Sequence, residues 1–118
     1  MLLADLLSAS LAWKPETGDS VLLGAVEADI PVVEAIAATL PAKARGRIFI
    51  EVEDASAIRE IPVPGRVCVT WLVRDRGQSL RTAVDAWLAE MLPVEAEREH
   101  RVYAWLSGDD SARVVTSD

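Results

Sequence analysis

The sequence predicts an α/β fold in which helices cover both faces of an open, mainly parallel β-sheet. Residues 47–52 and 67–72 are nearly continuous apolar runs rich in β-branched side chains, and each is followed by charged residues. Strands of a parallel sheet have this composition because helices bury them on both faces. Segments with helical periodicity alternate with these strands, and the connections are long enough for crossovers. Right-handed crossovers then produce three layers, with helices on both sides of the sheet.

The chain of 118 residues is expected to form one domain. Residues 1–18 are expected to add an N-terminal helix and a linker, because leucines recur there at helical spacing and Pro15 ends the pattern. Residues 19–118 then form the α/β core, which begins with a short buried strand at residues 21–24. Asp29 follows as the expected N-cap of the first core helix.

The remaining elements continue this alternation. The first core helix is expected to end at Pro41, and residues 54–61 are expected to include one irregular helical turn. Ser79 is expected to cap a second, amphipathic helix, which Pro93 ends. Three segments complete the chain: a charged connector at residues 95–101, a strand at residues 102–106, and a weak last strand at residues 112–116, expected to be antiparallel to the one before it.

Charge and hydropathy restrict the possible partners. The net charge is −7, with no basic block to offset it, which argues against binding to nucleic acid or to an anionic membrane surface. The apolar first residues are too few to span a membrane, lack a basic segment and include Asp5, so a signal peptide fits poorly. A cytoplasmic protein is expected.

The chain contains one cysteine, Cys68, which lies inside the apolar run at residues 67–72. A single cysteine excludes an intrachain disulfide and a cysteine-based zinc site. Cys68 is expected to be a small buried hydrophobic side chain, because unpaired cysteines are among the most buried residues. No metal site is expected.

Four segments, in the same order and at similar spacing, carry a family resemblance. They are residues 21–31, 40–54, 69–74 and 102–109. Together they resemble the C-terminal domain of the siderophore-interacting proteins, flavin-dependent ferric-siderophore reductases related to the ferredoxin reductases. The resemblance implies a sheet like that of the ferredoxin-reductase NAD(P)-binding domain.

The resemblance also implies cofactors. In that family an N-terminal β-barrel holds FAD, and the C-terminal domain is thought to receive NAD(P)H. Residues 1–18 are too short for such a barrel, which needs several strands. FAD is therefore not expected here, no cofactor is expected to bind tightly, and NADPH would bind weakly if at all.

A nucleotide site can be carried over from the family only in part. Alignment on Pro31 keeps the family's glutamate as Glu27, but Val26 and Ala28 stand where the family usually has aspartate and threonine, and Val73 replaces a common histidine. The loop precedes a helix N-terminus, where backbone N–H groups favour anions, although its acidic side chains repel phosphate. The nucleotide-contacting candidates are Glu27, Ala28, Asp29, Ile30, Arg74 and Arg76.

Each candidate also has a simpler interpretation. Arg74 and Arg76 could hold a 2′-phosphate at the end of a strand, or they could lie in a solvated loop and pair with neighbouring acids. Glu51 and Glu53 point to one side of their strand and could act as an acid–base pair, although a charge pair without a catalytic role fits better. His100 lies in the charged connector with nothing to complete a triad. No catalytic residue is assigned.

Three functions follow from the sequence. The first is an accessory or binding module linked to iron–siderophore metabolism, without flavin reductase activity of its own. The second is the NAD(P)H-binding half of a split ferric-siderophore reductase, whose partner would be a separate flavin-binding protein. The third is a structural or regulatory homodimer, since a fold alone does not determine activity.

Overall fold

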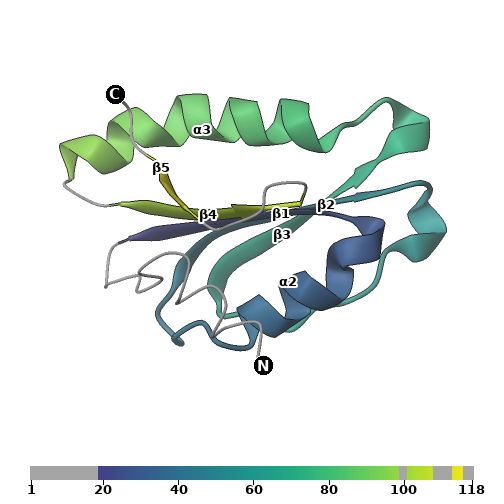
Figure 1. The fold of residues 1–118 in the computed structure, drawn as a ribbon, viewed down its shortest axis with the longest axis horizontal. Helices are drawn as coiled ribbons and strands as arrows, with labels where there is room; N and C mark the ends of the chain where they lie inside the picture. The colour runs from purple at the N-terminus through teal and green to yellow at the C-terminus, as the bar shows by residue number, and fades with distance from the viewer. Residues whose placement is uncertain (1–18, 99–100, 108–112, 116–118) are drawn as a thin grey trace.

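The computed structural model describes residues 19–98, 101–107 and 113–115, and it describes side chains as far as residue 107. The predicted helix at residues 1–18 and His100 lie outside the described residues. The chain forms one five-stranded sheet in the order β3-β2-β1-β4-β5 (Figure 1). The strands are β1 (Ser20–Val26), β2 (Arg45–Val52), β3 (Arg66–Val73), β4 (Val102–Leu106) and β5 (Arg113–Val115).

Strands β1 to β4 are parallel to their neighbours, and β5 pairs antiparallel with β4. Helix α2 (Ile30–Ala37) lies on one face of the sheet and helix α3 (Leu80–Glu97) on the other (Figure 1). Three short 3₁₀ turns, η1 (Glu27–Asp29), η2 (Ala55–Ala57) and η3 (Arg74–Arg76), follow β1, β2 and β3. The predicted fold class, an open and mainly parallel sheet between helices, is confirmed. None of the described helices is long and apolar enough to cross a membrane.

Alternation along β1 divides the core into two halves. Val21 and Leu23 are fully buried on the α2 side, where they pack with Val33 of the helix. Leu22 is fully buried on the α3 side, where it packs with Val84. A strand buried on both faces needs apolar residues at consecutive positions, which is why β1 lacks a polar–apolar alternation.

Helix α3 is longer than predicted. It continues through Pro93 to Glu97, and the expected charged connector is therefore partly helical. Glu95, expected at the start of the charged connector, is buried with a relative exposure of 1%. Its Oε2 accepts hydrogen bonds from Arg45 Nη2 at 2.6 Å and from Ser20 Oγ at 3.2 Å. These contacts hold the last turn of α3 on the sheet, so tertiary interactions outweigh the local cost of a proline within the helix.

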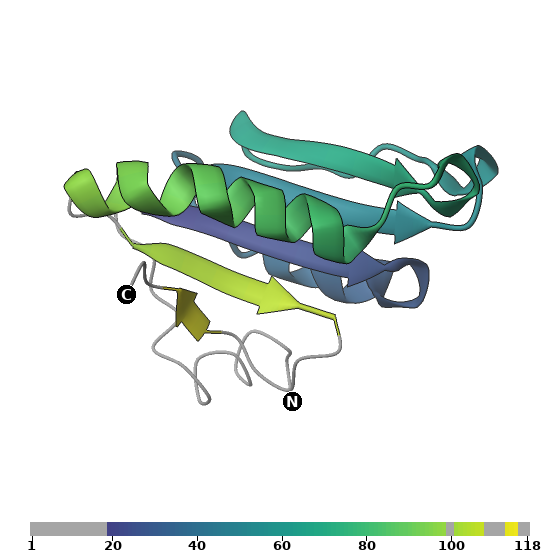
Figure 2. The same cartoon turned by 90° about the horizontal axis from the view of Figure 1, so that it is seen from above.

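The prediction that Cys68 is buried is wrong, because the side chain is exposed. Its strand, β3, is at the edge of the sheet. Helix α3 packs against β1 and β2, and Figure 2 shows most of β3 lying to one side of the helix. The amino half of β3 therefore has an open face, and Cys68 is on it.

Candidate functional site at the carboxyl ends of the strands

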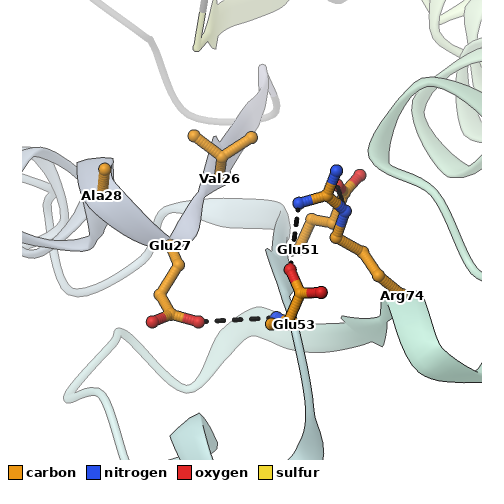
Figure 3. Close-up of a pocket in the computed structure, with 6 residues that line it drawn as sticks. All are labelled: Val26, Glu27, Ala28, Glu51, Glu53 and Arg74. Carbon is orange, nitrogen blue, oxygen red and sulfur yellow. Dashed lines mark hydrogen bonds and ion pairs between the residues drawn. The ribbon is translucent and has the colours of Figure 1, made fainter.

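The carboxyl ends of three adjacent parallel strands surround a pocket of about 440 Å³ (Figure 3). Its residues come from the ends of β1 and β2 and from the turns η1 and η3, because parallel strands bring their carboxyl ends to one edge of the sheet. The pocket is lined by Val26, Glu27, Ala28, Glu51, Glu53 and Arg74.

Two carboxylates hold the Arg74 guanidinium group in this pocket. Arg74 Nε lies 3.1 Å from Glu51 Oε1, and Arg74 Nη1 lies 3.2 Å from Glu53 Oε2. Glu51 is mostly buried, with 14% of its side chain exposed, while Glu53 is 69% exposed. The pair with Glu53 therefore contributes little, about 0–1 kcal/mol, as exposed ion pairs do. The pair with Glu51 is better shielded from water and determines where the guanidinium lies.

Glu51 has a second role, which the sequence did not reveal. Its Oε2 accepts a hydrogen bond of 2.6 Å from the Leu80 N–H, the first residue of α3. The predicted cap, Ser79, is confirmed: its Oγ accepts from the Thr82 N–H at 3.3 Å. A helix N-terminus attracts anions through its N–H groups and its dipole. At α3 this position is taken by the protein's own carboxylate.

The structure brings together only part of the predicted nucleotide site. Glu27, Ala28 and Arg74 line the pocket, and Glu27 Oε1 accepts a long hydrogen bond of 3.4 Å from the Glu53 N–H. Ile30 is buried, and its N–H donates to the Glu27 carbonyl within the η1 turn, so this N–H is already used. Arg76 is exposed in η3 and does not line the pocket.

Asp29 occupies the predicted N-cap position of α2, but its side chain makes no capping bond. Its Oδ2 instead accepts from Ser107 Oγ at 2.7 Å. Ser107 Oγ also accepts from the Val26 N–H at 3.2 Å, and the Ser107 N–H donates to the Gly24 carbonyl at 2.8 Å. Ser107, which follows β4, thus ties the end of β1 to the end of β4.

This connection lies at the point where the strand order reverses, between β1 and β4. Helix α2 connects β1 to β2 on one side of β1, whereas helix α3 connects β3 to β4, which lies on the other side of β1. Open α/β sheets bind ligands at such a reversal, in the crevice beyond the strand ends. Here the crevice contains a shallow space of about 310 Å³ lined by Leu80, Val84, Leu106 and Ser107, together with Glu51 and Arg81.

The residues of the pocket do not fit the pyrophosphate of a dinucleotide. Three carboxylates, those of Glu27, Glu51 and Glu53, surround a single guanidinium group, so the local charge is negative. A phosphate 4 Å from a carboxylate is repelled by roughly 1 kcal/mol in bulk water and roughly 4 kcal/mol near a protein surface. Within the described ranges, no three histidine, cysteine or acidic side chains are grouped to hold a metal ion.

Comparison with known proteins identifies the family. The family model described as siderophore-interacting protein matches residues 18–116, a range that includes every residue the structure describes. The chain belongs to the siderophore-interacting protein family. It is also 32% identical over 86 residues to ferric vibriobactin reductase ViuB of two Vibrio cholerae serotype O1 strains, an alignment that covers 73% of this chain and 31% of the relative.

Solved structures of siderophore-interacting proteins share the fold. The siderophore-interacting protein SipS from Aeromonas hydrophila superposes with a TM-score of 0.53 at 21% identity, covering 79% of this chain and 38% of that one. A siderophore utilization protein from T. fusca gives a TM-score of 0.52 at 23% identity, covering 84% and 49%. The chain thus spans less than half the length of each of these proteins and about a third of ViuB. The predicted family and its ferredoxin-reductase-like fold are confirmed.

Proposed function

We propose that this siderophore-interacting protein domain is a binding or accessory module of iron–siderophore metabolism that does not reduce ferric siderophores by itself. The observation that carries the proposal is the position of Arg74, whose guanidinium group is paired with both Glu51 and Glu53. Arg74 is the basic residue of the pocket that a nucleotide phosphate would need. The link to siderophores comes from the family and from ViuB, which is named a ferric vibriobactin reductase.

Charge supports this assignment. Two backbone N–H groups that could bind a phosphate already donate within the chain. The Leu80 N–H, at the N-terminus of α3, donates to Glu51, and the Ile30 N–H donates to the Glu27 carbonyl. The chain as a whole carries a charge of −7, which also disfavours a polyanionic cofactor. We place the protein in the cytoplasm as part of this proposal, with no tightly bound FAD and no tightly bound NADPH.

Two measurements on the purified chain test the proposal. The first follows tryptophan fluorescence during titration with ferric vibriobactin, and quenching that saturates is expected for a binding module. The second supplies ferric vibriobactin, FAD and NADPH and traps ferrous iron with a chromogenic chelator. The expected reduction rate equals that of the same mixture without protein. Reduction clearly faster than this background would refute the proposal, and an unchanged fluorescence would refute its binding-module form.

One observation favours a second function, the NAD(P)H-binding half of a split reductase. The Arg74 side chain is 60% exposed, and its pair with Glu53 lies in solvent. An exposed ion pair of this kind is weak, so Arg74 could exchange Glu53 for a nucleotide phosphate at small cost. A separate flavin-binding protein would then be the partner. Heat released at millimolar NADPH, and lost in Arg74→Ala, would favour this function over the first.

The edge of the sheet favours self-association as a third possibility. Strand β3 has eight residues and no neighbour on its outer side among the described strands. A free strand edge presents backbone N–H and C=O groups that can pair with another chain. A structural or regulatory homodimer would use this edge. Light scattering tests it, and a mass of 12.8 kDa at every concentration would exclude the homodimer.

A further inference from the structure

A second pocket, of about 350 Å³, lies at the opposite end of the sheet. It is formed at the amino ends of the first three strands, where Ser20, Arg45 and Arg66 are paired in register as the first residues of β1, β2 and β3. Arg45 reaches Glu95 of α3, so its side chain is on the α3 face of the sheet. Residues paired across neighbouring strands, and residues two apart along a strand, share a face. Arg47, Arg66 and Cys68 therefore project to the α3 face as well.

Helix α3 forms one wall of this pocket without closing it. Trp87 and Met91 of the helix line the space together with the three arginines and Cys68. The helix packs against β1 and β2, and Figure 2 shows most of β3 lying beside it. Arg66 and Cys68, which line the pocket from β3, are exposed to solvent. The pocket thus combines an apolar, partly aromatic wall with a basic floor.

Among the residues that the structure describes, carboxylates form an ion pair with one of the three arginines. Arg45 is paired with Glu95 at 2.6 Å. Arg47 Nη1 donates to the Thr70 hydroxyl group at 2.8 Å, which is a neutral partner. Arg66 is exposed, and no carboxylate of the described residues forms an ion pair with it or with Arg47. Two positive charges are therefore concentrated here in a chain whose net charge is −7.

The spacing of these charges suits one shared oxyanion. Arg47 lies opposite Cys68, and Arg66 is two residues before Cys68 on the neighbouring strand. With about 4.8 Å between strands and about 3.3 Å per residue, the two backbone positions are about 8 Å apart. The Arg47 guanidinium group is turned toward Thr70, which lies on the other side of Cys68 from Arg66. To hold one anion together with Arg66, Arg47 gives up this hydrogen bond to a neutral hydroxyl group and turns toward Arg66, a change that its long side chain allows. Guanidinium groups bind carboxylates in a two-pronged geometry. An anion between them would also relieve their mutual repulsion.

We propose that this amino-edge pocket binds an aromatic carboxylate. Arg47 and Arg66 hold the carboxylate group, and the ring lies against Trp87 and Met91, which offer a flat apolar surface. The site is separate from the acidic pocket at the carboxyl ends of the strands. It does not depend on whether that pocket binds a nucleotide or on the proposed function.

Cys68 provides a direct reporter, because it is the only cysteine of the chain and lines this pocket. The probe is 5,5′-dithiobis(2-nitrobenzoate), an aromatic dicarboxylate. The Cys68 thiolate attacks its disulfide, a new S–S bond to the protein forms, the S–S bond of the reagent breaks, and one nitrothiobenzoate leaves as a thiolate. The uncharged reagent 2,2′-dithiodipyridine reacts in the same way. The rate ratio of the two reagents, normalised to that of N-acetylcysteine, measures the preference of the pocket for an anion.

We expect a normalised preference of about tenfold or more for the dicarboxylate, the lower end of electrostatic enhancement. Arg47→Gln and Arg66→Gln should each lower this preference several-fold. A change in the reactivity of the Cys68 thiolate itself affects both reagents and cancels in the ratio. Arg59→Gln is the matched control, because it removes the same charge from a residue bonded to Glu34 of α2, on the opposite face. A preference near one, or an equal loss in Arg59→Gln, would overturn the proposal.

Protection tests reversible binding without covalent chemistry. Added 2-naphthoate should slow the reaction of Cys68 with 2,2′-dithiodipyridine, whereas the uncharged 2-naphthamide should not. Circular dichroism of each variant checks that the fold is kept. Equal protection by both compounds, or protection by neither, would overturn the proposal.

Discussion

The buried contact between Arg45 and Glu95 makes a quantitative prediction about stability. Arg45→Met removes the guanidinium group and keeps most of the side-chain volume. The Glu95 side chain is 1% exposed, and the Arg45 side chain is 25% exposed. Removing one partner of a fully buried ion pair costs about 3–5 kcal/mol. Because a quarter of Arg45 is in water, solvent screens part of this interaction, and we expect a loss of about 2–3 kcal/mol.

Thermal unfolding followed by circular dichroism measures this loss. For a domain of this size 1 kcal/mol corresponds to about 3–5 °C, so the midpoint should fall by about 6–15 °C. Arg47→Met is the matched control, since the partner of Arg47 within the described ranges is the neutral Thr70 hydroxyl group. The loss of this hydrogen bond should cost less than about 1 kcal/mol. If Arg45→Met and Arg47→Met melted within about 2 °C of each other, the reasoning about the buried pair would be refuted.

Two further predictions concern the backbone and the acid stability. In Gly46→Ala the new Cβ would lie 1.9 Å from the Val21 carbonyl oxygen, so the pairing of β1 with β2 must shift. The free energy of unfolding, measured in urea, should fall by more than about 3 kcal/mol. Gly65→Ala is the control and should be nearly neutral, because no atom lies within 4 Å of the new Cβ. The Ser56 hydroxyl and N–H groups donate to Asp54 and lower its pKa below the ordinary 3.8. A lowered pKa contributes stability that is present above the unfolded value and is lost as the pH falls through the folded one. Asp54→Asn should therefore lose less stability than the wild type between about pH 5 and pH 2, and parallel curves would contradict this.

The sheet was predictable because the sequence pattern of its strands is local. Residues 47–52 and 67–72 are nearly continuous apolar runs, a pattern typical of strands that are covered on both faces, and both are strands in the structure. Strand β2 is buried at consecutive positions, Ile48 to Ile50, whereas β3 is only partly buried. Of the two predicted helix caps, Ser79 caps α3 as expected, whereas Asp29 makes no capping hydrogen bond. The family followed from several short segments in the right order, none of which would have been specific alone.

Residues whose surroundings depend on the order of the strands were not predictable. Cys68 looked buried because its strand is apolar, but β3 is at the edge of the sheet and α3 leaves its amino half open. Pro93 looked like a helix end, yet the distant contacts of Glu95 with β1 and β2 keep the last turn helical. The exposure of Cys68 and the helical last turn of α3 both depend on contacts between elements that are distant in the sequence and meet only in the folded chain.

The candidate site was only partly predictable for the same reason. Arg74 and Glu27 were identified from the family loop and the strand end, and they do line one pocket. The role of Glu51 at the start of α3 was missed, although a carboxylate at the end of a strand next to an expected helix start was a usable signal. Arg76 was expected beside Arg74, but it is exposed in the η3 turn and does not line the pocket.

Calorimetric titration with NADPH tests the central claim, that internal carboxylates make the carboxyl-edge pocket unfit for a nucleotide. The double variant Glu51→Gln/Glu53→Gln removes two negative charges beside Arg74. The amide oxygen introduced at position 51 can still accept the hydrogen bond from the Leu80 N–H. The wild-type chain should release no heat at millimolar NADPH, and the double variant should show measurable binding that Arg74→Ala removes. Micromolar binding by the wild type, lost on Arg74→Ala, would contradict the claim.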